Sequence, residues 1–84
     1  WPNPFNPTTT VGFALPQAGT VRLSVHDARG RLVRVLADAP LAAGSHRVRW
    51  DGRDRRGQAA ASGVYLVRLQ TPQGQQVHKM TLAR

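Results

Sequence analysis

The sequence predicts an all-β domain built as an antiparallel β-sandwich, and three features lead to this prediction. Apolar and polar residues alternate along most of the chain, whereas helical periodicity is hard to find. Turn-forming clusters of Gly, Pro and Asp recur at intervals of about ten residues. Trp50 ends a central alternating run, where its large side chain would fill the space between two sheets. We therefore expect short strands joined by tight turns.

The chain begins with a segment, WPNPFNP, that fits neither a helix nor a central strand. Its prolines favour an extended backbone, but its two aromatic residues are unusual for a disordered linker. We expect residues 1–8 to form a docked, proline-rich lead-in from an upstream domain, with Phe5 packed against an open end of the sandwich. The alternative is an ordinary linker, because domain termini are commonly disordered. The β-sandwich itself is expected over residues 9–84.

The first strands follow this lead-in. Residues 11–15 and 21–25 alternate between apolar side chains and small or polar ones. A turn is expected at 27–30, where Asp can bond its own downstream backbone and Gly accepts positive φ. Residues 31–37 are apolar on both sides of the alternation, which favours a strand covered on both faces over a short helix. A surface connection is expected at 38–44.

Further alternating runs complete the domain. They are separated by a polar loop and by a Pro- and Gly-containing turn. The runs cover residues 46–50, 65–69 and 75–83, the loop residues 51–58 and the turn residues 71–74. Runs of this length and spacing best fit a seven-stranded antiparallel immunoglobulin-like β-sandwich.

The composition excludes several classes of site. The 84 residues make one small domain without cysteine, so neither a disulfide nor a thiolate–metal site supports the fold. No apolar run reaches the ~20 residues that span a bilayer, so no transmembrane segment is expected. The chain neither begins with Met nor carries a signal peptide, which predicts that it is a piece of a longer protein.

Metal-binding and catalytic residues are poorly supplied. Asp51 and Asp54 lie in a loop flanked by glycines and form a weak calcium candidate, because a calcium loop offers more oxygen ligands and fewer arginines. The alternative is that both aspartates cap turns. The histidines lie on different strands without paired spacing for zinc, and no serine lies in a nucleophile motif. We therefore expect no enzymatic activity and no cofactor.

The chain is strongly basic, with twelve Lys and Arg residues against four acidic residues and a formal net charge of +8. If their strands are neighbours, one basic sheet face is formed by Arg22, Arg47, Arg49 and Arg68. An anionic cell-surface glycolipid or an acidic partner would suit this face. Nucleic acid is not expected, because no exposed aromatic residue is interleaved to stack on bases. The alternatives are a solvated basic face and the Arg- and Ala-rich bias of a GC-rich genome.

Several motifs occur in an order typical of one group of domains. PNPFNPTT leads into a strand that ends in Leu15-Pro16, and it is followed by GTVRLSVHDARGRLVRVL, AAGSHRVRWDGRDRRGQ, ASGVYLVRL and HKMTLAR. This ordered set resembles the C-terminal sorting domains of type IX (Por-type) secretion, and equally the related immunoglobulin-like domain of the flagellar hook-capping protein. The resemblance covers essentially the whole chain. It departs at Trp1, where tyrosine is common, and in the strong positive charge.

The resemblance implies a non-catalytic C-terminal domain of a larger secreted bacterial protein, which reaches the cell surface or the medium through the periplasm. Such a domain acts as a folded sorting and cell-surface attachment signal. Its partners would be the outer-membrane secretion machinery and the upstream cargo domain of the same chain. The alternative role is a structural accessory or assembly module like the hook cap, and polyanion binding ranks third.

The resemblance also carries over to two sets of residues. The last strand is the direct recognition element, because a terminal strand can be read by β-addition at a sheet edge. Its residues are His78, Lys79, Met80, Leu82 and Arg84. The second set serves the fold through turns and core packing. Its residues are Trp50, Asp51, Gly52, Gly63 and Tyr65. Phe5, expected to be anchored in the lead-in, is a further structural residue.

Overall fold

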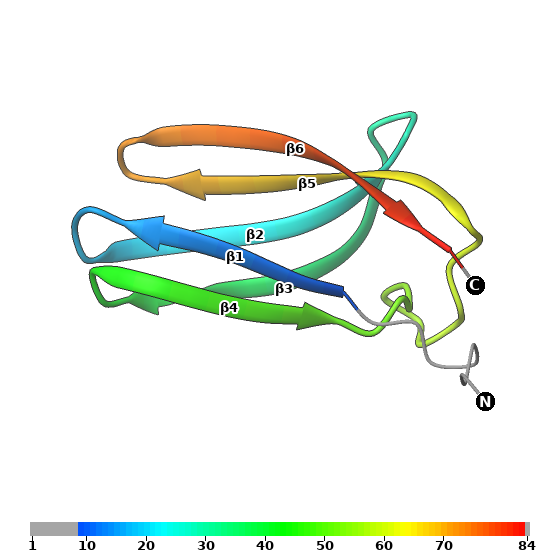
Figure 1. Ribbon diagram of the computed structural model, residues 1–84, viewed down its shortest axis with the longest axis horizontal. Coiled ribbons are helices and arrows are strands. Elements are labelled where there is room, and N and C mark those ends of the chain that lie inside the picture. The colour runs from blue at the N-terminus through cyan, green and yellow to red at the C-terminus, as the bar shows by residue number, and fades with distance from the viewer. Residues whose placement is uncertain (1–8, 84) are drawn as a thin grey trace.

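The computed structural model describes residues 9–83, which form antiparallel strands and no helix (Figure 1). No helix in this part of the chain could therefore cross a membrane. The strands are β1 (Thr9–Leu15), β2 (Gly19–Asp27), β3 (Leu32–Leu41), β4 (Gly44–Trp50), β5 (Gly63–Thr71) and β6 (Gly74–Leu82). All six alternating runs of the sequence are confirmed as strands, including residues 31–37, for which a short helix was the alternative.

The expected number of seven strands is wrong for the described residues, which form six. The loop between β4 and β5 contributes only an isolated bridge between Arg53 and Ala59. The cause is local, because the carboxylates of Asp51 and Asp54 accept hydrogen bonds from the backbone two residues further on and bend the loop into successive turns.

The strands form two sheets that pack on each other (Figure 1). The smaller sheet pairs β1 with β4 in a regular register from Thr9 opposite Trp50 to Leu15 opposite Gly44. The larger sheet has the order β3-β2-β5-β6, so β3 and β6 are its edges. Every pairing is antiparallel.

Strand β3 runs further than the sequence predicted, because part of the expected surface connection at 38–44 continues the strand to Leu41. Pro40 is tolerated there since an edge strand needs only one of its two sides for hydrogen bonding. The pairing of β2 with β3 is interrupted by two register shifts, next to Ser24 and next to His26. These bulges increase the local twist of the edge.

The core consists of two neighbouring clusters between the sheets. One cluster is aliphatic and contains Leu15, Val21, Leu23, Val67 and Leu69. The other contains Val25, Trp50, Tyr65 and Leu82. The Trp50 side chain is fully buried and packs edge-on against Tyr65, with ring centroids 5.2 Å apart. Both rings satisfy their polar atoms, because Trp50 Nε1 donates to the carbonyl of Arg53 and the Tyr65 hydroxyl donates to that of Ala61.

Candidate interaction site

The last strand, β6, is an edge strand with no partner on its outer side among the described residues. It pairs with β5 along its whole length, from Gly74 opposite Thr71 to Leu82 opposite Gly63, without a register shift. The outer row of its backbone N–H and C=O groups is therefore free to bind another strand.

The two edges of the larger sheet differ in how they are protected. The other edge, β3, carries Pro40 and two register shifts, and such features discourage pairing with a further strand. Strand β6 has no proline and no bulge, and Lys79 is its only Lys, Arg, Asp or Glu residue. The regular edge of β6 is thus the better template for strand addition.

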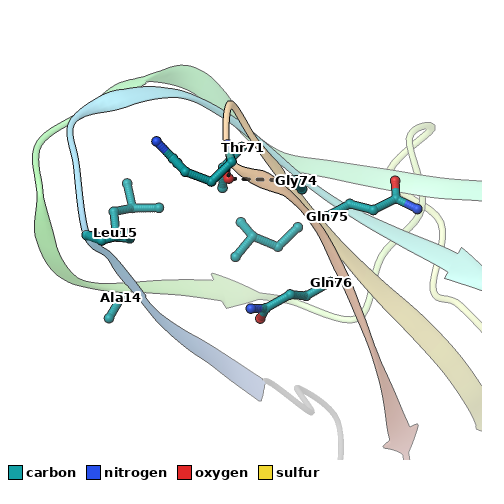
Figure 2. A pocket seen from close by; sticks show the side chains of 9 residues that line it. Ala14, Leu15, Thr71, Gly74, Gln75 and Gln76 are labelled. Atoms are coloured by element: carbon teal, nitrogen blue, oxygen red, sulfur yellow. Dashed lines mark hydrogen bonds between the residues drawn. The ribbon is translucent and has the colours of Figure 1, made fainter.

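A groove lies beside this edge, between β6 and β1. It is made of two hollows of about 190 and 110 Å³. Figure 2 shows Ala14 and Leu15 of β1 on one side of the first hollow and Gln76 of β6 on the other. We call this feature the β1/β6 groove. Its principal lining residues are Val11, Phe13, Ala14, Leu15, Leu23, Val67, Leu69, Gln76 and His78.

The groove exists because the smaller sheet does not cover the inner side of β6. Gln76 lies opposite Leu69 and His78 opposite Val67, so both side chains belong to the face that carries the core. Both are nevertheless exposed, whereas Leu82 on the same face is buried. Polar residues therefore stand on the core face where the second sheet ends, above an apolar floor of Leu23, Val67 and Leu69.

This arrangement suits the binding of an extended polypeptide segment. Such a segment would pair with the backbone of β6 and place alternate side chains over the apolar floor of the groove. None of the residues that line the two hollows is acidic. The site thus offers main-chain hydrogen bonding and apolar contact, and it does not repel an acidic segment.

The structure separates the predicted recognition residues into two groups. His78 and Lys79 are exposed on β6, and Lys79 points to the outer face of the sheet. Met80 is half-buried and Leu82 is buried, so both pack in the core. Arg84 lies outside the described residues, as does Phe5 of the predicted lead-in.

The β1 side of the groove was not predicted from the sequence. The available signal was the pattern of the last strand, where Val77 differs in parity from Met80 and Leu82 and so belongs to the opposite face. The core-facing positions nearer the hairpin are then Gln76 and His78. Polar residues at core positions indicate that the opposing sheet does not reach that part of the strand.

The aspartates of the 51–58 loop are used by the loop itself. Asp51 Oδ1 accepts from the backbone N–H of Arg53 and from Arg34 Nη1, at 3.0 and 2.9 Å. Asp54 Oδ1 accepts from the backbone N–H groups of Arg56 and Gln58. Residues 9–83 hold no group of three or more metal-binding side chains.

The two glycines among the expected structural landmarks have positive φ. Gly52 has a φ of 75° directly after β4, and Gly63 has a φ of 152° at the start of β5. Gly52 is also buried, and its carbonyl accepts from the backbone N–H of Ala60, which closes the loop. A left-handed backbone at a buried position accounts for glycine there.

The four arginines expected to form one basic face lie on two different sheets. Arg22 and Arg68 are on β2 and β5 of the larger sheet, whereas Arg47 and Arg49 are on β4 of the smaller one. The expectation of one face fails because β4 pairs with β1 and not with β2 or β5. Arg68 is moreover bound to Gln75 Oε1 through two of its nitrogens.

Comparisons with known proteins agree with this architecture. The family model of the FlgD Ig-like domain matches residues 3–75. The solved structure of FlgD from P. aeruginosa superposes with a TM-score of 0.70 at 28% identity, over 89% of this chain and 59% of that one. FlgD from Xanthomonas campestris, described for hook capping in flagellar assembly, gives 0.64 at 30% identity, over 93% of this chain and 56% of that one.

A third solved structure shares the fold at lower identity. The dimeric latent PorU from Porphyromonas gingivalis superposes with a TM-score of 0.69 at 24% identity, and it covers 100% of this chain and 9% of that one. No curated protein matches the chain. The chain spans less than two thirds of the length of each of these three structures.

Proposed function

The chain belongs to the FlgD Ig-like domain family, and from this premise we propose that it is a non-catalytic interaction domain of a larger exported bacterial protein. Its site is the outer edge of β6 together with the β1/β6 groove. The domain works by accepting an extended segment of a partner at this edge. We propose neither a catalytic reaction nor a cofactor for it.

One observation carries this proposal: β6 is a regular nine-residue edge strand beside an apolar groove. A protein of this size gains stability by burying such a surface, and the strand instead leaves its edge unpaired and its core-facing side partly uncovered. A bound segment would satisfy the free backbone groups and cover the exposed part of Phe13 at the same time.

In the cell, this interaction serves sorting. The domain acts as a folded signal for outer-membrane translocation and cell-surface attachment, and the secretion machinery binds the β6 edge. The protein accordingly travels through the periplasm to the cell surface or the medium. Support comes from the fold shared with the PorU chain, in which a domain of this size is a small part of a much longer protein.

The second candidate role is assembly, in which the edge binds another subunit of a surface structure. The family match favours this role, because the related FlgD structures include a protein described for hook capping. Both roles use the same edge and differ in the partner. An acidic glycolipid of the cell surface is a further partner under the sorting role, and a nucleic acid is not proposed.

Surface display of a reporter distinguishes the two roles. A fluorescent protein with an export signal is fused to residues 1–84 and produced in the native organism, and exposure to an external protease is measured. Under the sorting role the reporter reaches the outer surface. Retention of the fusion in the periplasm would contradict sorting and leave assembly as the role to test.

The variant that removes the site has to keep the fold. Removing β6 is unsuitable, because Leu82 is a core residue. Proline is instead placed at Val77 in one variant and at His78 in another. Of two adjacent residues in an edge strand, one N–H faces the neighbouring strand and the other faces the open side. The variant whose melting temperature equals that of the parent has lost only the N–H on the open side. If that variant is displayed as well as the parent, the β6 edge is not the signal.

A further inference from the structure

A second site is formed at the end of the sandwich opposite the β5–β6 turn, where the β2–β3 turn lies beside the loop between β4 and β5. The start of β3 contacts this loop through Arg34. Its Nη1 donates to Asp51 Oδ1 at 2.9 Å and to the carbonyl of Arg53 at 3.3 Å. The backbone N–H of Arg55 also donates to the carbonyl of Val33 at 3.0 Å. These contacts hold the loops at a fixed distance.

Positive charge is concentrated in these two loops and in the ends of β2 and β3 beside them. Together they carry six of the chain's twelve basic residues and three of its four acidic residues. The six are Arg29, Arg31, Arg34, Arg53, Arg55 and Arg56. The three acidic residues are Asp27, Asp51 and Asp54.

The acidic residues are occupied by their own turns. Asp27 accepts from the backbone N–H groups of Arg29 and Arg31, and its second oxygen pairs with Arg31 Nε at 3.1 Å. Asp54 accepts only backbone N–H groups within its turn. Within residues 9–83, the exposed guanidinium groups of Arg29, Arg55 and Arg56 are left without a hydrogen-bonded acceptor.

Between the loops lies a cleft of about 460 Å³. It is lined by Asp27, Arg31, Leu32, Val33, Asp54, Arg55 and Arg56. Three arginines, two aspartates and two aliphatic residues therefore line the same cleft. A guanidinium fork matches the oxygens of phosphate and can bind them in pairs, which favours phosphate over a single-point anion.

We propose that this cleft binds a phosphate monoester, with Arg55 and Arg56 as the ligands of the phosphate oxygens and Leu32 and Val33 beneath the body of the ligand. Arg31 contributes charge while it remains paired with Asp27. The site is distinct from the β1/β6 groove and does not depend on the function proposed for that groove. Phosphate could come from a soluble compound or from a lipid headgroup, which the experiment separates.

The test is a titration of the ¹⁵N-labelled protein followed by NMR at constant ionic strength. One arm adds inorganic phosphate, and the other adds vesicles of phosphatidylcholine with or without phosphatidic acid. The variant R55Q/R56Q removes the two unpaired arginines of the cleft. The matched control is R47Q/R49Q, which removes the same charge from exposed positions of β4.

The proposal predicts binding that is weakened roughly tenfold or more in R55Q/R56Q and retained in R47Q/R49Q, because each charge-assisted hydrogen bond is worth about a factor of ten. Binding of inorganic phosphate with this pattern identifies a soluble ligand. Binding only to vesicles with phosphatidic acid, with the same pattern, identifies a lipid headgroup. Equal weakening by both variants would show diffuse charge attraction and overturn the proposal, as would absence of binding in both arms.

Discussion

Trp50 joins the two sheets at the level of a single side chain. It lies on β4 of the smaller sheet, is fully buried, and contacts Tyr65 on β5 of the larger sheet. Replacing Trp50 with Ala removes this contact and leaves a cavity, so we expect the free energy of unfolding to fall by roughly 3–5 kcal/mol. Urea unfolding measures the change. The control is Val64→Ala, at a position where the side chain is 44% exposed, and it is expected to change little.

A substitution at Gly52 tests whether the loop after Trp50 requires a left-handed backbone at this position. Its φ of 75° is left-handed, so an alanine there adds about 1–2 kcal/mol of backbone strain. We expect Gly52→Ala to lower the melting temperature. Gly12→Ala is the matched control, because an added Cβ at Gly12 has its nearest neighbour, the carbonyl oxygen of His46, 3.9 Å away. Equal melting temperatures for the two variants would contradict this account of Gly52.

Asp27 makes stability depend on pH. The backbone N–H of Arg31 donates to its carboxylate and, with the Arg31 side chain and the N–H of Arg29, holds the pKa of Asp27 below its ordinary value of 3.8. A carboxyl whose pKa is lowered by folding stabilises the protein fully above its unfolded value and loses that contribution as the pH falls through the folded value. Asp27→Asn should therefore destabilise the protein at neutral pH.

The difference between Asp27→Asn and the parent should shrink as the pH falls below 3.8. Unfolding in urea at a series of pH values measures both proteins under the same conditions. A difference that stays constant over this range would mean that the charge of Asp27 contributes nothing and that only its turn geometry matters.

Residue patterns predicted the strands and turns that form the two proposed sites. They did not predict which of these elements lie beside one another. The alternation in residues 75–83 is sufficient to predict a strand, and the Asp-containing turns follow from their composition. The partner of each strand does not follow, because pairing is set by contacts that are distant in the sequence. Arg22 and Arg47 look equivalent in the sequence, and the pairing of β4 with β1 places them on different sheets.

At the scale of the element, β6 is predicted to respond differently to proline at two adjacent positions. In Val77→Pro or His78→Pro, one substitution removes a hydrogen bond to β5 and should cost about 1–3 kcal/mol, while the other removes an N–H that faces the open edge. Thermal unfolding of both variants gives the comparison. Equal losses would mean that the outer edge of β6 is also paired in the folded protein.

Local hydrogen bonding explains why residues 9–83 form no seventh strand. The stretch between β4 and β5 has too few large apolar residues for an alternating pattern. Its aspartates accept hydrogen bonds from the nearby backbone, so this stretch forms turns instead of a strand. The fold class could be predicted without this segment, because the six other runs are long enough to be recognised. Arg55 and Arg56 of this stretch line the proposed phosphate-binding cleft only because the fold places the turn at 27–31 beside them.

At the scale of the whole molecule, the two proposed sites lie apart. The β1/β6 groove reaches the β5–β6 turn, and the proposed phosphate-binding cleft lies between the β2–β3 turn and the β4–β5 loop. These connections lie at opposite ends of the strands (Figure 1). Strand β1 begins and β6 ends toward the end that carries the cleft. A partner bound along β6 can therefore reach the groove without displacing a ligand of the cleft.

Photo-crosslinking in the native organism shows directly whether a partner segment binds between β1 and β6. A photoreactive residue is placed at Phe13, at Gln76 or, as a control on the outer sheet face, at Val64 of the complete exported protein. We predict that Phe13 and Gln76, on the two sides of the groove, crosslink to the same partner and that Val64 does not. Adducts from Val64 alone, or none from either groove position, would contradict the account.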